Sequence, residues 1–147
     1  MKKKIWFDMD GTIADFYAVD GWVEYLANSD VFPYATAKPM HNFSVLARLL
    51  NELQRRGYFI GVISWASRTA TPEYKKAIDL TKRDWLARHL KSVNFDKIEV
   101  VAYGTPKEVG RDGILFDDNE EIRKAWGEGA FEPNKIIEVL KELLRNG

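Results

Sequence analysis

The sequence of 147 residues contains no cysteine. This absence excludes disulfide bridges, thiolate zinc sites and cysteine nucleophiles, and it suits a reducing compartment, so we expect a cytoplasmic protein. The chain also lacks net charge, because 22 basic residues balance 22 acidic ones. A neutral chain has no long-range field to attract nucleic acid or an anionic membrane, which disfavours both as partners but leaves local patches open.

Long apolar runs are missing as well, and no stretch approaches the roughly 20 apolar residues of a membrane span. Lys2, Lys3 and Lys4 precede an apolar run of only three residues, so we expect no signal peptide and no membrane partner. The composition itself is that of a globular protein, with 46% hydrophobic and 30% charged residues. We therefore expect a single domain with its own core over residues 1–147.

The first stretch with chemical character is residues 5–12, Ile-Trp-Phe-Asp-Met-Asp-Gly-Thr. Three apolar residues before a glycine turn predict a buried parallel strand that ends at Asp8 and Asp10. In open α/β sheets the carboxyl ends of the strands form the ligand crevice. Two carboxylates there repel each other unless a positive charge lies between them, which favours a hard divalent cation. One carboxylate is then free to act as a nucleophile.

Apolar periodicity places the other elements in alternating order. We expect strands at 4–8, 58–63, 95–101, 114–116 and 130–131, and helices at 43–56, 71–90, 120–126 and 133–144. This alternation predicts an α/β fold with a doubly wound, mainly parallel five-stranded sheet, in which 4–8 is central and 95–101 is a more exposed edge. Residues 15–42 are expected to be an insertion with one short helix and an irregular, aromatic-rich loop, whose aromatic side chains either pack onto the core or roof a site.

Other polar side chains follow the predicted strands. Ser64 comes directly after 58–63, where its hydroxyl can bind a phosphoryl oxygen or cap a turn. Arg68, in the next loop, could donate two hydrogen bonds to a substrate phosphate or could be a solvated surface charge. Asp117 and Asp118 end the strand 114–116, where they can bind a metal or cap the next helix. Lys107 lies a few residues before that strand, as a functional cation or a surface lysine.

An acidic Asp-x-Asp-Gly-Thr motif, a hydroxyl, a lysine and an acidic pair, in this order, resemble the motifs of the haloacid dehalogenase-like (HAD) phosphatases over nearly the whole chain. The resemblance implies a Rossmann-like core with a small cap formed by residues 15–42. It also implies Mg²⁺ as the cofactor and hydrolysis of a phosphomonoester through an aspartyl-phosphate intermediate.

The resemblance also assigns roles. Asp8 corresponds to the nucleophile, and Asp10 to the general acid that protonates the leaving group and then activates water. The candidate metal ligands are Asp8, Asp10 (whose backbone carbonyl can face the metal), Asp117 and Asp118. Because Mg²⁺ usually takes only one or two carboxylates, one member of the second pair is expected outside the direct ligands. The candidate phosphate-binding or substrate-binding residues are Thr12, Ser64, Arg68 and Lys107, of which Thr12 could instead support the turn.

The substrate is the least determined feature. The Thr105-Pro106-Lys107 turn before a strand ending in two aspartates looks most like the small 5′(3′)-deoxyribonucleotidase branch, so a small phosphorylated molecule such as a nucleotide is expected. A polynucleotide-end phosphatase is an alternative, with a groove built from Trp65, Arg68, Lys82 and Arg83. A phosphotransferase and a non-catalytic binding module on the same fold also stay open. A small cap leaves the site open to a large substrate, or closed by a partner subunit in a homo-oligomer.

Overall fold

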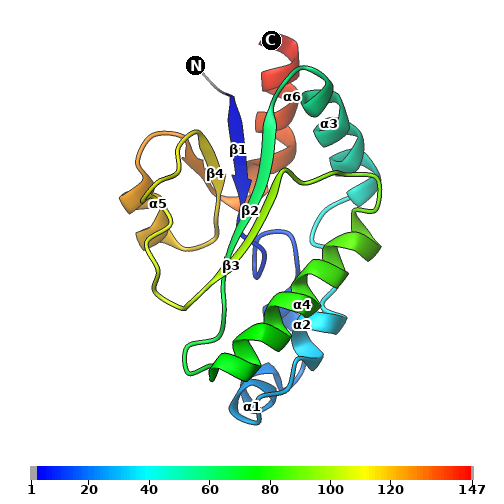
Figure 1. Ribbon diagram of the computed structural model, residues 1–147. Helices are drawn as coiled ribbons and strands as arrows, with labels where there is room; N and C mark the ends of the chain where they lie inside the picture. Colours follow the sequence, from blue (N-terminus) through cyan, green and yellow to red (C-terminus); the bar gives the residue numbers. More distant parts are fainter. Residues whose placement is uncertain (1–2, 147) are drawn as a thin grey trace.

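The computed structural model describes residues 3–146, so Met1, Gly147 and Lys2 of the N-terminal lysine run lie outside the described part. Five parallel strands form one sheet in the order β3-β2-β1-β4-β5 (Figure 1). Their bounds are β1 (Lys4–Phe7), β2 (Phe59–Trp65), β3 (Lys97–Val101), β4 (Ile114–Phe116) and β5 (Ala130–Phe131). The parallel α/β fold, the central first strand and the edge position of β3 are confirmed.

The register of β1 explains why the predicted site residues meet. Ile5 pairs with Ile60 of β2 on one side and with Ile114 of β4 on the other. Just beyond the strand, the backbone N–H of Asp8 donates to the carbonyl of Phe116 at 2.9 Å. Because all the strands run parallel, the residues that follow β1 and β4 lie at the same edge of the sheet.

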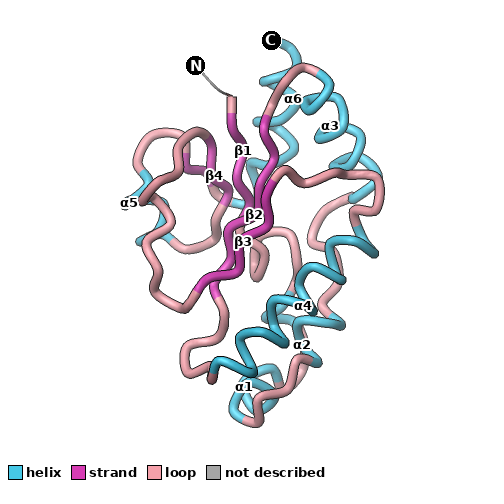
Figure 2. Tube along the Cα trace, viewed as in Figure 1, coloured by secondary structure: helices cyan, strands magenta, loops and turns pink. Residues whose placement is uncertain are grey.

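Alternate side chains of β1 serve the two faces of the sheet. Ile5 and Phe7 belong to one core with residues of α3 (Phe43–Arg55), α4 (Pro72–His89) and α6 (Ile136–Asn146), whereas Trp6 packs with residues of α5 (Glu120–Trp126). Figures 1 and 2 show α5 on one side of the sheet and these other helices on the opposite side. These side chains are almost completely buried, which explains why the strand is apolar on both faces. Of the described helices, none combines the length and the apolar character that crossing a membrane demands.

Side-chain caps set where three of the helices begin. Asn42 accepts hydrogen bonds from the backbone at the start of α3, Thr71 accepts one from Tyr74 N at the start of α4, and Asn119 accepts one from Ile122 N at the start of α5. These caps satisfy N–H groups that have no partner within the helix. The Asn119 cap places α5 directly after Asp117 and Asp118.

The segment 15–42 is more ordered than an irregular loop. It contains a 3₁₀ turn, η1 (Phe16–Ala18), and two short helices, α1 (Trp22–Ala27) and α2 (Phe32–Thr36), of which α2 was not predicted. Five residues are too few to show a helical period in the sequence. The helix forms because Asp30 accepts a hydrogen bond from Phe32 N, proline is favoured in the first turn, and Tyr34 is buried.

Two further boundaries differ from the sequence expectation. β2 continues through Ser64 and Trp65 instead of ending at residue 63, so Ser64 lies inside a strand. The last helix begins at Ile136 after a 3₁₀ turn, η2 (Pro133–Lys135), rather than at residue 133. Both shifts are within the range of one or two residues expected at element ends.

Candidate active site

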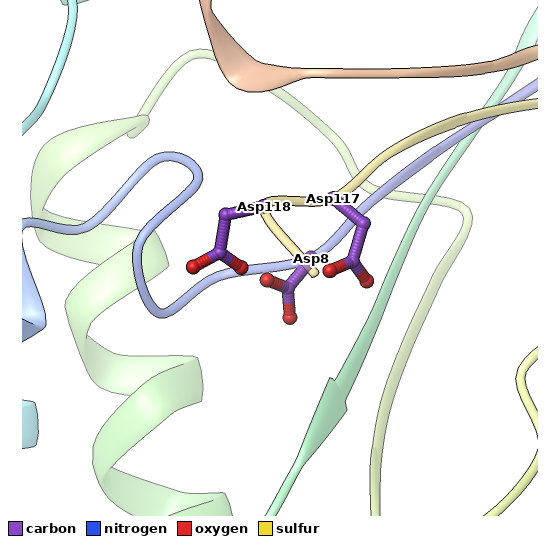
Figure 3. A group of neighbouring side chains, drawn as sticks. All are labelled: Asp8, Asp117 and Asp118. Atoms are coloured by element: carbon purple, nitrogen blue, oxygen red, sulfur yellow. The ribbon is translucent and has the colours of Figure 1, made fainter. Parts of the chain in front are cut away.

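Three carboxyl groups meet where β1 and β4 end. Asp8, Asp117 and Asp118 each offer an oxygen within 4.8 Å of the others, and Figure 3 shows them side by side. Asp8 and Asp117 are buried, whereas Asp118 is exposed. The structure thus brings together acids that are more than a hundred residues apart in the chain, as their positions at strand ends predicted.

The turn after β1 admits only glycine at position 11. Gly11 has φ of +80°, a conformation that side-chain-bearing residues rarely adopt. A β-carbon there would also collide with the Asp118 carboxyl group and touch the ring of Tyr17. The missing side chain therefore lets the acidic pair after β4 approach the turn that carries Asp8 and Asp10.

Thr12 supports this arrangement through two hydrogen bonds. Its side chain is fully buried, and its hydroxyl donates to Asp8 Oδ2 at 2.9 Å while accepting from the backbone N–H of Asp118 at 3.2 Å. Thr12 is not among the residues that line the cavity described below. The two hydrogen bonds of Thr12 thus link Asp8 to the backbone at Asp118.

Lys107 lies between the acids of the two strands. Its Nζ donates to Asp8 Oδ1 at 3.0 Å and to Asp117 Oδ2 at 2.7 Å. Burial lowers the pKa of Lys107, but the charges and hydrogen bonds of Asp8 and Asp117 outweigh it and raise the pKa above its ordinary value. The ammonium therefore stays charged. Arg111 anchors the loop that carries Lys107, because it donates to the Lys107 carbonyl and pairs with Glu99 of β3 at 2.7 Å.

The side chain of Asp10 lies apart from the three clustered acids. Its Oδ2 accepts a hydrogen bond of 2.9 Å from Nζ of Lys82, a residue of α4. The same ammonium donates to Ser64 Oγ at 2.6 Å and to the Trp65 carbonyl at 2.8 Å. Burial, followed by the charge of Asp8, raises the pKa of Asp10 against the opposing effect of Lys82. A raised pKa suits a carboxyl group that must carry a proton.

Ser64, which was predicted to bind a phosphoryl oxygen or to cap a turn, lies beside Lys82. Its side chain is fully buried, its hydroxyl accepts from Lys82, and it does not line the cavity. Ser67, three residues later, lines the cavity instead, together with Arg68, which is exposed. Because side chains alternate along a strand, the hydroxyl at position 64 lies on the face that α4 covers, where it meets Lys82.

With all four carboxyl groups ionised, the site has two more negative than positive charges, which is the charge that one divalent cation neutralises. Asp8, Asp10, Asp117 and Asp118 contribute four carboxylates, and the buried Lys82 and Lys107 contribute two ammonium groups. Two oxygens bound to one Mg²⁺ lie up to about 4.2 Å apart, close to the spacing within the three-acid cluster. The donor set, all oxygen and with two negative charges in excess, therefore fits a hard divalent cation.

Without a bound cation, the carboxyl groups of the cluster repel one another and their pKa values are raised. Burial and the charge of Asp8 raise the pKa of Asp117 to about 6, against the lowering effect of Lys107. The Asp118 side chain is partly exposed, yet desolvation, the Asp8 charge and a hydrogen bond with Asp8 raise its pKa to about 8. Like charges at this spacing disfavour ionisation, and a bound cation reverses that effect.

A cavity of about 320 Å³ opens above the carboxylates. Besides acids and Lys107, aromatic side chains from both sides line it: Phe16, Tyr17, Trp22 and Tyr34 from the segment 15–42, and Trp65 and Tyr103 from the sheet side. Trp65 and Tyr103 pack on each other with ring centroids 4.9 Å apart. By contrast, Tyr25 and Phe32 pair with each other and do not line the cavity. The insertion aromatics therefore divide between roofing the site and packing.

The basic groove expected of a polynucleotide-end phosphatase is not assembled from the four predicted residues. Lys82 is only 1% exposed, and Arg83 pairs with Asp79 at 2.6 Å on the outer side of α4. Neither lines the cavity, whereas Trp65 and Arg68 do. Of the four residues, two therefore lie at the cavity and two do not.

The contact of Lys82 with Asp10 was not predicted from the sequence, where Lys82 was considered only for a polynucleotide groove. A signal was present, because Lys82 stands four residues after Ile78 and three before Trp85, both fully buried on α4. A lysine at that spacing falls within the apolar stripe of the helix. Lysine is almost never fully buried without a partner, so its position alone pointed to a buried acid.

Comparison with known proteins adds a likeness of fold. The sequence matches no protein-family model and no curated protein. A D,D-heptose 1,7-bisphosphate phosphatase from Burkholderia thailandensis is 14% identical, with a TM-score of 0.59 over 97% of this chain and 99% of that chain. An MCSG target protein from Vibrio cholerae is 21% identical, with a TM-score of 0.53 over 98% of each chain. At these identities the likeness shows a shared fold.

Proposed function

We propose that the protein is a haloacid dehalogenase-like phosphatase that hydrolyses phosphomonoesters with Mg²⁺. The observation that carries this proposal is the position of Asp8, which lines the cavity between the acidic pair after β4 and the ammonium of Lys107. The two hydrogen bonds to its carboxylate, from Thr12 and Lys107, hold it in one orientation. A nucleophile that is fixed before the substrate arrives needs little reorganisation in the reaction.

In the first step, a carboxylate oxygen of Asp8 attacks phosphorus and the bond from phosphorus to the ester oxygen breaks. Asp10 gives its proton to the departing oxygen, so the products are an aspartyl-phosphate on Asp8 and a neutral alcohol. In the second step, Asp10 takes a proton from water as the water oxygen attacks phosphorus. The bond between phosphorus and Asp8 then breaks and inorganic phosphate leaves, which restores both acids.

The residues that would hold the cation are Asp8, the backbone carbonyl of Asp10, and Asp117 or Asp118. When bound, Mg²⁺ supplies positive charge that offsets the phosphate dianion and the acids around it. Lys107 supports the same charge balance from the protein side, since its ammonium is fixed between Asp8 and Asp117. Arg68, exposed at the edge of the cavity, is the group that reaches outward to the phosphate or to the rest of the substrate.

The proposed substrate is a small phosphate ester with a flat leaving group, for which a nucleotide is the leading candidate. Aromatic rings on both sides of the cavity support this, because stacking between rings favours planar ligands. The segment 15–42 supplies four of the six rings, so we propose that it acts as a small cap over the site.

The test is phosphate release from p-nitrophenyl phosphate and from a panel of nucleoside monophosphates, with Mg²⁺ and with a chelator. We expect turnover only with Mg²⁺, and its loss in Asp8→Asn. Asp112→Asn is the matched control, because Asp112 is exposed and pairs with Lys4 away from the cavity. Activity that survives Asp8→Asn, or a wild type inactive on the whole panel, would contradict the proposal.

A second measurement separates a phosphatase from a binding module that shares the fold. Beryllium fluoride, a mimic of the phosphoryl group, is expected to bind Asp8 when Mg²⁺ is present and to raise the melting temperature. Asp8→Asn is expected to remove that increase. A wild type that neither binds the mimic nor releases phosphate favours the binding module.

A further inference from the structure

The ammonium of Lys82 is buried and fully engaged. Its side chain is 1% exposed, and its three acceptors are Asp10 Oδ2, Ser64 Oγ and the Trp65 carbonyl, all within 2.9 Å. An ammonium group has three N–H donors, so all of them are used. Lys82 does not line the cavity. It is therefore not available to a substrate in this arrangement, whereas Lys107 lines the cavity and donates to only two carboxylate oxygens.

Along its helix, Lys82 lies among apolar side chains. It belongs to the buried side of α4 with Ile78, Trp85 and Leu86, and the ring of Tyr34 lies 5.0 Å from its Nζ. Burying a charge carries a large desolvation penalty that a well-packed apolar side chain avoids. The arrangement is therefore poorly explained by stability alone, and it points to a function of the charge at this place.

The function concerns Asp10. This residue lines the cavity, and its carboxylate forms an ion pair with Lys82. The hydrogen bond engages Oδ2, which leaves Oδ1 to exchange a proton. The other two bonds of Lys82 fix the ammonium to β2, so the carboxylate is tied to the sheet as well as to its own turn. A general acid must lie within hydrogen-bond reach of the oxygen that it protonates, and small displacements are costly.

We propose that Lys82 is the positioning residue of the general acid–base Asp10. It holds the carboxylate so that Oδ1 faces the leaving oxygen in the first step and the attacking water in the second. This inference rests on the proposed phosphatase function. It distinguishes the two buried lysines of the site, because Lys107 serves the nucleophile and Lys82 serves the proton transfer.

The variant that tests it is Lys82→Met, which keeps the length of the side chain and removes the charge. p-Nitrophenolate leaves readily without a proton, whereas an alkyl alcohol needs one. We therefore expect a rapid burst of about one p-nitrophenol per protein, followed by slow turnover because the water is poorly activated. With an alkyl phosphate such as glycerol phosphate, the first step itself should slow by about 100-fold or more. Loss of both the burst and alkyl turnover to the same degree would indicate a purely structural role and overturn the proposal.

Lys75→Met is the matched control, because Lys75 lies two turns earlier on α4, is half-buried and donates to a backbone carbonyl, that of Val100. It is expected to leave both steps unchanged. A double-mutant cycle with Asp10→Asn provides a second test. If Lys82 acts through Asp10, adding Lys82→Met to Asp10→Asn changes the alkyl phosphate rate less than about threefold. If Lys82→Met lowers the alkyl phosphate rate equally in the wild type and in Asp10→Asn, the proposal is contradicted.

A crystal structure of Lys82→Met separates this inference from the phosphatase function itself. We expect the Asp10 carboxylate to leave its position while Asp8, Asp117 and Asp118 stay in place. An Asp10 side chain that keeps its orientation without Lys82 would overturn the positioning role, whatever the activity of the wild type. A wild type without turnover but with a displaced Asp10 in the variant would contradict the phosphatase and retain the positioning.

Discussion

Nζ of Lys107 lies 3.0 Å from Asp8 Oδ1, although the two residues are 99 positions apart in the chain. Both side chains are buried, and the contact joins the end of β1 to the loop that precedes β4. The fold thus depends on the same ion pair that fixes the proposed nucleophile, so one substitution affects stability and activity together.

Replacing Lys107 by methionine is expected to lower phosphate release by about 100-fold or more, because a fixed positive charge beside the reacting group is lost. It also leaves Asp8 and Asp117 buried without their cation, which is expected to lower the free energy of unfolding by about 3 kcal/mol at neutral pH. Urea denaturation and phosphate release measure the two effects. Lys97→Met is the control, since Lys97 is 58% exposed and pairs with Glu99 on the surface. A loss of stability no larger than that of the control would contradict the buried ion pair.

Gly11→Ala is expected to destabilise the protein and to weaken metal binding. The positive φ costs about 1–2 kcal/mol for any side chain, and the new β-carbon in addition displaces the Asp118 carboxyl group. Gly57→Ala is the matched control, because Gly57 has φ of +92° but nothing within 4 Å of its ideal β-carbon. Denaturation and Mg²⁺ titration by calorimetry should show a loss of Mg²⁺ affinity for Gly11→Ala alone. Equal effects of the two substitutions would mean that Asp118 needs no empty space at residue 11.

Without a metal, the stability of the protein is expected to fall as the pH rises from about 4 to about 8. The folded state raises the pKa of Asp118 to about 8 from 3.8, so between these values it binds more protons than the unfolded chain does. Raising the pH therefore favours unfolding, and partial exposure of the side chain makes the slope modest. Urea denaturation in a chelator from pH 5 to pH 8 measures it.

Asp118→Asn should flatten this slope, and saturating Mg²⁺ should remove it for the wild type, because the carboxyl group is then ionised in both the folded and the unfolded state. Asp84→Asn is the control, because Asp84 is 66% exposed and pairs with Arg88 on α4. Stability that does not depend on pH in the chelator, or a slope that is unchanged in Asp118→Asn, would contradict the proposed crowding of the three acids.

Tyr103→Ala is expected to raise KM about 10-fold for an aryl or nucleotide phosphate and to leave glycerol phosphate nearly unchanged. Tyr103 is 52% exposed and packs on Trp65 at the wall of the cavity, so its loss removes stacking without disturbing the core. Steady-state kinetics with both substrates measure the difference. Val109→Ala, in the same loop and 68% exposed, is the control. An equal change for the two substrates would argue against recognition of a flat leaving group.

The architecture was largely predictable because its signals are local. Short apolar runs marked the strands of the sheet except β3, which alternation marked, and the acids directly after Phe7 and Phe116 had to meet once these strands were neighbours. The short helix α2 was not predictable, since five residues show no period and the helix is stabilised by burial of Tyr34. The role of Thr12 as a support for Asp8 was only one of two readings, because the direction of a hydroxyl is set by groups distant in sequence.

By itself, the sequence determined that carboxylates end two parallel strands and that a lysine precedes the second, since strand identity and the order of motifs depend on neighbouring residues alone. Only the tertiary structure decided that Ser64 faces inward, that Lys82 and not a loop residue contacts Asp10, and which aromatic rings line the cavity. The physical reason is that a buried charge takes its partner from whatever surface the packing of helix on sheet brings within hydrogen-bond distance. Which partner lies within reach depends on the register of the strand and on the rotation of the helix. A shift of one residue in the strand turns a side chain to the other face of the sheet.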